Sequence, residues 1–94
     1  MGDTIDIMCR VDRLKYHIIF INPAGAESGN CRAPYRVGKE QVFCNKKFNI
    51  NQDLKTNTTT LIIEKSKRIY GRWKCYHGSN NGYDSLDINN PGKY

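Results

Sequence analysis

Apolar and polar residues alternate along several short stretches of this chain, which is the pattern of β-strands with one buried face. The clearest stretch covers residues 3–11, where every second residue from Ile5 to Val11 is apolar. A second strand is predicted over residues 16–21. It ends at Asn22-Pro23-Ala24-Gly25, which is a strong turn signal. Helical signals are weak, since β-branched and aromatic residues dominate between the turns.

The alternation resumes in the second half of the chain. Strands are predicted from Phe48-Asn49-Ile50 onward and over residues 58–65, 72–77 and 83–89. Ser79-Asn80-Asn81-Gly82 offers an Asn-Gly hairpin turn between the last two of these strands. Residues 26–47 are the least regular part of the sequence.

Six or seven short strands at this spacing predict an all-β fold, an antiparallel β-sandwich. A chain of 94 residues leaves room for one domain, so residues 1–94 are predicted to be a single domain. Met1 and Gly2 are expected to be an artificial addition. The longest apolar run, Ile18 to Ile21, is too short for a membrane-spanning helix or a signal-peptide core, so no membrane insertion is expected.

The charge balance is basic, with 15 Lys and Arg against 9 Asp and Glu, a net charge of +6. Such a balance favours nucleic acid, acidic glycans or anionic membranes as partners. The basic residues are scattered except for one cluster, formed by Lys65, Lys67, Arg68, Arg72 and Lys74. Solvated charge without a partner explains that cluster as well, and no nucleic acid is expected.

Four cysteines, Cys9, Cys31, Cys44 and Cys75, form an even set in a small chain. No Cys-x-x-Cys pair occurs, and the two histidines lack zinc-finger spacing, so no metal site is predicted. Two disulfides in an oxidising compartment fit better, which predicts an extracellular protein, secreted or displayed on a cell surface. Four cysteines allow three connectivities, and the sequence alone does not choose among them.

Three motifs occur in a fixed order: Ile5-x-Ile7-x-Cys9, Leu61-x-Ile63 and Gly71-x-Trp73-x-Cys75. In this order and spacing the chain resembles an immunoglobulin domain over about residues 3–90. The resemblance implies an immunoglobulin-like β-sandwich of about seven strands, with the motifs on strands B, E and F. It also implies that Cys9 pairs with Cys75 across the two sheets. Cys31 and Cys44 then form a second disulfide, or remain two buried thiols.

The sequence departs from the family pattern at three positions. Phe20 stands where strand C usually carries a tryptophan, and Trp73 occupies the position of the family's corner tyrosine. Ile69 replaces the aspartate of a local salt bridge. We therefore expect Phe20 and Trp73 to form an aromatic plug beside the Cys9–Cys75 disulfide. Only eight residues precede Cys9, so the family's strand A, which comes before strand B, is expected to be short or truncated.

Strand parity predicts a protein-binding face. If Trp73 and Cys75 point inward, their neighbours point outward, and the same parity on residues 16–21 and 83–89 selects further outward residues. The predicted binding residues are Ile19, Ile21, Arg72, Lys74, Tyr76, Tyr83 and Asp87. Exposed aliphatic patches mark contact surfaces, and Tyr and Arg are favoured interface residues. A shift of one residue in the parity would bury Ile19 and Ile21 instead.

The resemblance implies a non-catalytic binding domain that recognises another protein in cell adhesion or immune recognition. Receptors of this family use the sheet of strands G, F and C for homophilic or heterophilic contacts. The first alternative is a module that binds an anionic glycan or a nucleic acid through the basic cluster.

A second alternative is a small secreted ribonuclease that uses His17 and His77 with Lys74. Strand parity places the two histidines on different faces, so no catalytic residue is predicted, and no cofactor is expected. Asn57-Thr58-Thr59 matches the N-glycosylation sequon in a polar turn, which a plain turn explains equally well.

Overall fold

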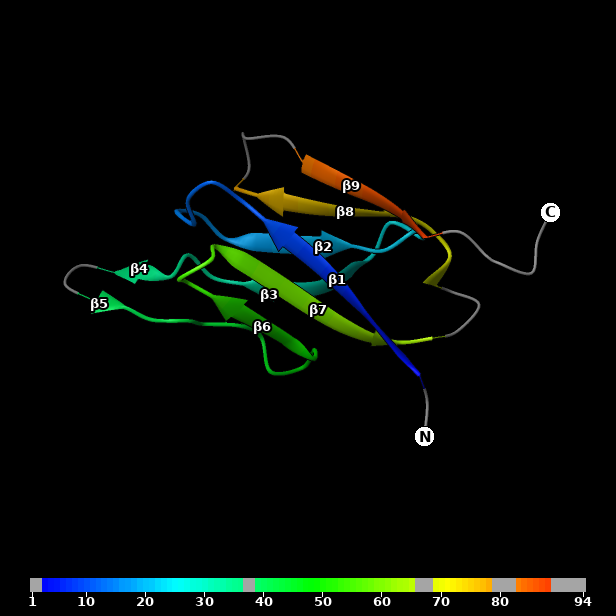
Figure 1. Cartoon of the computed structure of the whole chain (residues 1–94), viewed down its shortest axis with the longest axis horizontal. Helices are drawn as coiled ribbons and strands as arrows, with labels where there is room; N and C mark the ends of the chain where they lie inside the picture. Colours follow the sequence, from blue (N-terminus) through cyan, green and yellow to red (C-terminus); the bar gives the residue numbers. More distant parts are fainter. Residues whose placement is uncertain (1–2, 37–38, 66–68, 79–82, 89–94) are drawn as a thin grey trace.

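The computed structural model describes residues 3–36, 39–65, 69–78 and 83–88. Within these ranges the chain forms β-strands and no α-helix (Figure 1). The strands are β1 (Thr4–Arg10), β2 (Ile18–Ile21), β3 (Glu27–Cys31), β4 (Tyr35–Arg36), β5 (Lys39–Glu40), β6 (Ile50–Asp53), β7 (Thr58–Glu64), β8 (Gly71–His77) and β9 (Tyr83–Ile88).

Seven of these strands form two antiparallel sheets. One sheet has the order β1-β7-β6 and the other the order β3-β2-β8-β9, whereas β4 and β5 pair as a separate ribbon. Figure 1 shows the three-stranded sheet in front, with β1 crossing over β2 of the four-stranded sheet. The predicted all-β antiparallel sandwich is confirmed.

The core lies between the two sheets and is built from alternate positions of their strands. On β1 the buried positions are Ile7 and Cys9, as the period-two pattern predicts. The full cluster of buried core residues is Ile7, Cys9, Leu14, Ile18, Phe20, Leu61, Ile69, Trp73 and Cys75. Inward positions of both sheets contribute to it, so neither sheet has a separate core.

The strands predicted over residues 3–11, 16–21, 58–65, 72–77 and 83–89 are present with ends shifted by one or two residues. The strand predicted from Phe48 onward is also present, as β6, and begins two residues later at Ile50. A turn that begins at Asn45 precedes β6. The Asn45 side-chain Oδ1 accepts from Lys47 N at 3.0 Å, and the Asn45 carbonyl accepts from Phe48 N at 3.2 Å. The predicted hairpin turn at residues 79–82 lies outside the described residues.

The segment predicted to be least regular contains a strand. β3 pairs antiparallel with β2 and places Gly29 opposite Phe20. A Cβ atom on Gly29 would lie 3.0 Å from Leu61 Cδ1 and 3.2 Å from Ile50 Cδ1. The absence of a side chain at Gly29 therefore lets β3 approach the core closely.

Both disulfides are formed. Cys9–Cys75 joins β1 to β8, with the two Cα atoms 6.3 Å apart, as the resemblance implies. Cys31–Cys44 joins the end of β3 to the returning chain, with the Cα atoms 3.9 Å apart. None of the four cysteines is free.

Phe20 and Trp73 lie where the aromatic plug is predicted. Phe20 is opposite Cys75 on the neighbouring strand and is completely buried. Trp73 is 4% exposed, and its indole Nε1 donates a hydrogen bond to the carbonyl oxygen of Ile69 at 2.8 Å. This bond ties the start of β8 to the segment that precedes it.

One side of the sandwich is open. β1 and β9 are edge strands of their sheets, and the Cys9–Cys75 disulfide joins β1 to β8, the neighbour of β9. Leu86 of β9 is paired with Trp73 and therefore points to the inner face, yet it remains 47% exposed. Because β1 ends its sheet, no described strand covers Leu86, so β9 contributes less to the core than its sequence pattern suggests.

Candidate protein-binding face

The strand register brings the predicted binding residues onto one surface, the outer face of the sheet β3-β2-β8-β9. Ile19 lies opposite Tyr76, and Ile21 lies opposite Lys74. On the next strand Tyr83 lies opposite Tyr76, and Asp87 lies opposite Arg72. Residues opposite each other in adjacent strands point to the same side of the sheet, so all seven predicted residues share this outer face.

Aromatic and charged contacts organise the β8-β9 part of the outer face. The rings of Tyr76 and Tyr83 lie with their centroids 5.2 Å apart, and Lys74 Nζ lies 4.9 Å from the Tyr83 centroid. Arg72 donates to both carboxylate oxygens of Asp87, at 2.9 and 3.2 Å. This contact lowers the pKa of Asp87 and raises the pKa of Arg72.

The aliphatic residues of the outer face are half-buried. Ile19 and Ile21 both retain partial solvent exposure on β2, whereas Ile18 and Phe20, which alternate with them, are fully buried. Ile19 is flanked by Tyr76 on one neighbouring strand and by Asn30 on the other. The result is a small apolar strip with polar side chains on both sides, which is how the centre and rim of a protein interface are composed.

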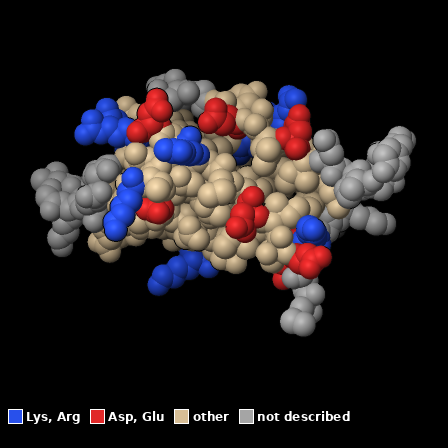
Figure 2. All heavy atoms as spheres, in the orientation of Figure 1, with Lys and Arg blue, Asp and Glu red and all other residues tan. Residues whose placement is uncertain are grey.

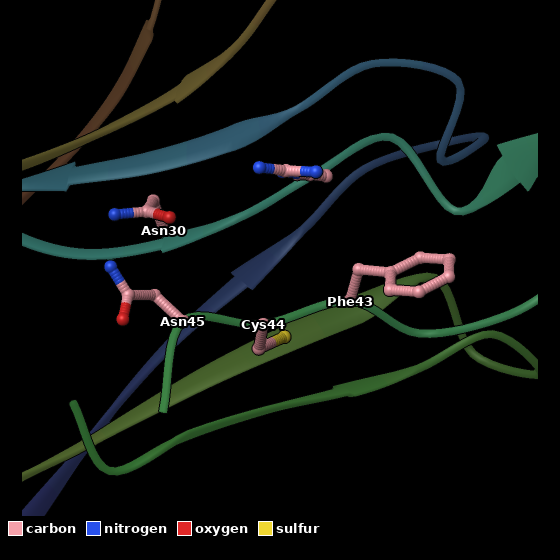
Figure 3. A pocket seen from close by; sticks show the side chains of 5 residues that line it. Asn30, Phe43, Cys44 and Asn45 are labelled. Carbon is pink, nitrogen blue, oxygen red and sulfur yellow. The ribbon is translucent and has the colours of Figure 1, made fainter. Parts of the chain in front are cut away.

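A cavity of about 390 Å³ opens at the β3 end of this sheet. Its walls are formed by residues 30–32, at the end of β3, and by residues 43–45, which the second disulfide joins to them (Figure 3). The lining residues are Asn30, Arg32, Phe43, Cys44 and Asn45.

The cavity walls are held by a short antiparallel pairing between residues 30–32 and residues 43–45. Arg32 N donates to the carbonyl of Phe43 at 2.8 Å, and Asn45 N donates to the carbonyl of Asn30 at 2.9 Å. These bonds leave Cys31 and Cys44 as a non-hydrogen-bonded cross-strand pair, the position at which Cα atoms approach most closely. The side chains on either side of each cysteine therefore point to the outer face, where Asn30 already faces Ile19.

None of the cavity residues is predicted from the sequence, apart from the cysteine itself. They fall in residues 26–47, where the apolar alternation is interrupted by Gly29 and by polar residues. The spacing of Cys31 and Cys44 was the available signal. A disulfide closing so short a loop brings the residues beside each cysteine together.

The predicted basic cluster is only partly described. Lys67 and Arg68 lie outside the described residues. The Arg72 guanidinium forms an ion pair with Asp87, and Lys74 Nζ lies over the ring of Tyr83. Figure 2 shows acidic and basic side chains interspersed on the visible face, which is that of the three-stranded sheet. Because Arg72 and Lys74 already have partners within the sheet β3-β2-β8-β9, the described part of the cluster gives little support to an extended anion-binding surface.

The two histidines have different environments. Nε2 of His77 accepts hydrogen bonds from the backbone N–H groups of Lys15 and Tyr16, each at 3.1 Å. The Tyr16 ring lies 5.2 Å from the His77 ring. Partial burial lowers the pKa of His77 from its ordinary 6.5, and the nearby charge of His17 lowers it further. Nε2 of His77 is therefore engaged in holding the segment before β2.

We expect the stability of the domain to fall as the pH falls below about 6.5. The pKa of His77 is lowered in the folded state. Between pH 6.5 and that lower pKa, the unfolded chain therefore binds more protons than the folded domain. Stability is then fully present above 6.5 and decreases on acidification. Thermal unfolding followed by circular dichroism at pH 7.5 and 5.5 measures the effect. His77→Gln should flatten the dependence, and an unchanged decrease in that variant would contradict the role given to His77.

Asn57 has a structural role in its turn. Its backbone φ of 54° lies in the left-handed region that asparagine tolerates. Its side-chain Oδ1 accepts from Leu14 N at 3.3 Å, and Nδ2 donates to the carbonyl of Asp12 at 3.1 Å. The side chain thereby connects the turn before β7 to the loop after β1. Glycosylation of Asn57 stays a prediction.

No group of three or more His, Cys, Asp or Glu side chains within the described ranges is arranged to hold a metal ion. In the same ranges, no helix is long and apolar enough to cross a membrane. Comparisons with protein-family models, with curated protein sequences and with solved structures each found no match to this chain. The function is therefore inferred from the chain's own side chains and their arrangement.

Proposed function

We propose that this chain is an extracellular, immunoglobulin-like domain that recognises another protein through the outer face of the sheet β3-β2-β8-β9, and that it is not an enzyme. The partner is a second copy of the domain or a different protein, as in cell adhesion or immune recognition. The domain requires no cofactor for this function.

The observation that carries the proposal is the half-buried pair Ile19 and Ile21 beside the tyrosines of β8 and β9. Aliphatic side chains on the solvent side of a sheet leave apolar area in water, which a partner would bury. The Arg72–Asp87 ion pair and Lys74 lie at the margin of this strip, where charges set orientation and partner choice. We therefore assign Ile19, Ile21 and Tyr76 to the centre of the interface.

The strand order supports the immunoglobulin-like assignment. In an immunoglobulin domain strands B, E and D form one sheet and strands C, F and G the other, with further strands beside C in some types. The orders β1-β7-β6 and β3-β2-β8-β9 correspond to B-E-D and C′-C-F-G. The bond from Trp73 Nε1 to the Ile69 carbonyl is comparable to the bond of the corner tyrosine, which also reaches backbone a few residues upstream.

Two disulfides in a domain of this size favour an oxidising compartment. That supports placing the domain outside the cell, where a recognition face would meet its partner.

Sedimentation of the oxidised domain over a wide concentration range tests the homophilic form of the proposal. We expect Ile19→Asp to weaken self-association by more than about 1 kcal/mol, because it places a charge at the apolar centre. Tyr83→Ala, at a residue that is 50% exposed, should weaken it without affecting folding. Met8→Asp is the matched control, since Met8 is 65% exposed on the outer side of β1.

Self-association that is lost in Met8→Asp but retained in Ile19→Asp would contradict the assignment of this face. Circular dichroism of each variant shows whether the fold is retained. A monomer at every concentration would exclude the homophilic form and leave recognition of a different protein.

A further inference from the structure

The cavity beside the second disulfide contains hydrogen-bond donors that the domain itself does not use. The guanidinium of Arg32 makes no hydrogen bond or ion pair with another described residue, and the side chain is exposed. Asn45 accepts from Lys47 N through Oδ1, which leaves its Nδ2 donor available. In Figure 3 that nitrogen points toward the side chain of Asn30 across the cavity.

The local charge favours an anion. Arg32 is the cation that lines the cavity, and exposed Lys46 and Lys47 follow Asn45 along the chain. Among the described side chains around the cavity, the acidic one is Glu27, and its Oε2 accepts from Asn30 Nδ2 at 2.9 Å. The available side-chain donors that line the cavity are therefore the cationic guanidinium of Arg32 and the neutral Nδ2 of Asn45.

We propose that this cavity binds the carboxylate of an acidic side chain, glutamate or aspartate, presented by the partner protein. The guanidinium of Arg32 pairs with the carboxylate, Asn45 Nδ2 donates a further hydrogen bond, and Phe43 forms the apolar side of the cavity. Arginine suits this task because its planar donors match the two oxygens of a carboxylate. This inference rests on the proposed function, and it names the chemistry of the partner at one end of the outer face.

The cavity is prepared for binding before a ligand arrives. The disulfide Cys31–Cys44 and the two flanking backbone hydrogen bonds fix the distance between its walls. A fixed backbone lowers the conformational entropy lost on binding, so that the ordering cost is confined to side chains such as Arg32. The volume of about 390 Å³ lies within the range of small-ligand sites and exceeds what one carboxylate side chain needs.

The test is an NMR titration of the isotope-labelled domain with N-acetyl-L-glutamate N-methylamide, which carries only the side-chain carboxylate. We expect saturable shifts of the amide signals of residues 30–32 and 43–45. The matched glutamine compound, which is neutral, should give none. Arg32→Gln should weaken binding of the glutamate compound at least tenfold, whereas Arg10→Gln, at an exposed arginine of β1, should leave it unchanged.

Equal shifts with the glutamate and glutamine compounds, or undiminished binding by Arg32→Gln, would overturn the carboxylate site. Tighter binding of D-glucuronate than of the glutamate compound would overturn the assignment to a protein side chain and favour an acidic sugar. The titration needs no partner, so it separates this site from the proposed function. If Ile19→Asp binds both the probe and the partner protein as tightly as the wild type does, the carboxylate site stands and the proposed recognition face fails.

Discussion

Replacing both Cys9 and Cys75 with alanine is expected to lower the free energy of unfolding by about 4 kcal/mol. The two cysteines are 66 residues apart in sequence, and opening so long a loop restores much conformational freedom to the unfolded chain. Both are also buried in the core, at 4% and 7% exposure, so the substitution removes packed sulfur atoms. Because small domains have a total stability of about 5–15 kcal/mol, this loss is a large share of the total, and the urea midpoint of the variant should fall well below that of the wild type.

Urea unfolding of the oxidised proteins, followed by tryptophan fluorescence, measures this loss. The double substitution of Cys31 and Cys44 is the matched control: its loop spans 13 residues, for which the same model gives about 3 kcal/mol. That variant should remain folded, because the disulfide lies at the β3 end of the sheet and outside the main core cluster. A loss below about 1 kcal/mol for the Cys9 and Cys75 variant would contradict the role of this bond in joining the two sheets.

Trp73→Ala is expected to destabilise the domain by about 3–5 kcal/mol, the usual cost of removing a large buried aromatic side chain. Trp73 is 4% exposed and belongs to the core cluster with Phe20 and both cysteines of the inter-sheet disulfide. Removal of the indole leaves a cavity between the sheets, and it also leaves the carbonyl of Ile69 without its hydrogen-bond donor. Chemical unfolding followed by far-ultraviolet circular dichroism measures the change.

Trp73→Phe separates the two contributions. The phenyl ring retains much of the packing but cannot donate to Ile69, so the expected loss is smaller, about 1–3 kcal/mol. Equal losses for the alanine and phenylalanine variants would mean that the hydrogen bond, and not the packing, accounts for the effect. A negligible loss in both would contradict the placement of Trp73 in the core.

The strands of the two sheets are largely predictable because their inner positions carry large apolar residues. Ile5, Ile7 and Cys9 identify β1, and the Trp73–Cys75 pair identifies the inner side of β8. β3 is not predictable in this way, because its core-facing positions are Gly29 and Cys31. A glycine that faces the core gives no apolar signal, although a Cβ atom there would lie in tight contact with Leu61 and Ile50.

The outer face follows from the sequence for the same reason: once one residue of a strand points inward, its neighbours point outward. The positions of Ile19, Tyr76 and Tyr83 depend only on parity and on β2, β8 and β9 being adjacent. The cavity does not follow, because its walls come from strands whose pairing depends on how the chain between Cys31 and Cys44 returns. Nor does parity show that no strand of the described residues covers the inner face of β9, where Leu86 is 47% exposed.

The most direct measurement of the proposed recognition face is a binding screen against extracellular proteins, the domain itself included. The domain is displayed as a pentamer so that weak contacts are detected through avidity. Wild type, Ile19→Asp and the control Met8→Asp are screened in parallel. We expect wild type and Met8→Asp to bind the same partner and Ile19→Asp to lose it. A partner that binds Ile19→Asp as well as it binds wild type would contradict recognition through this face.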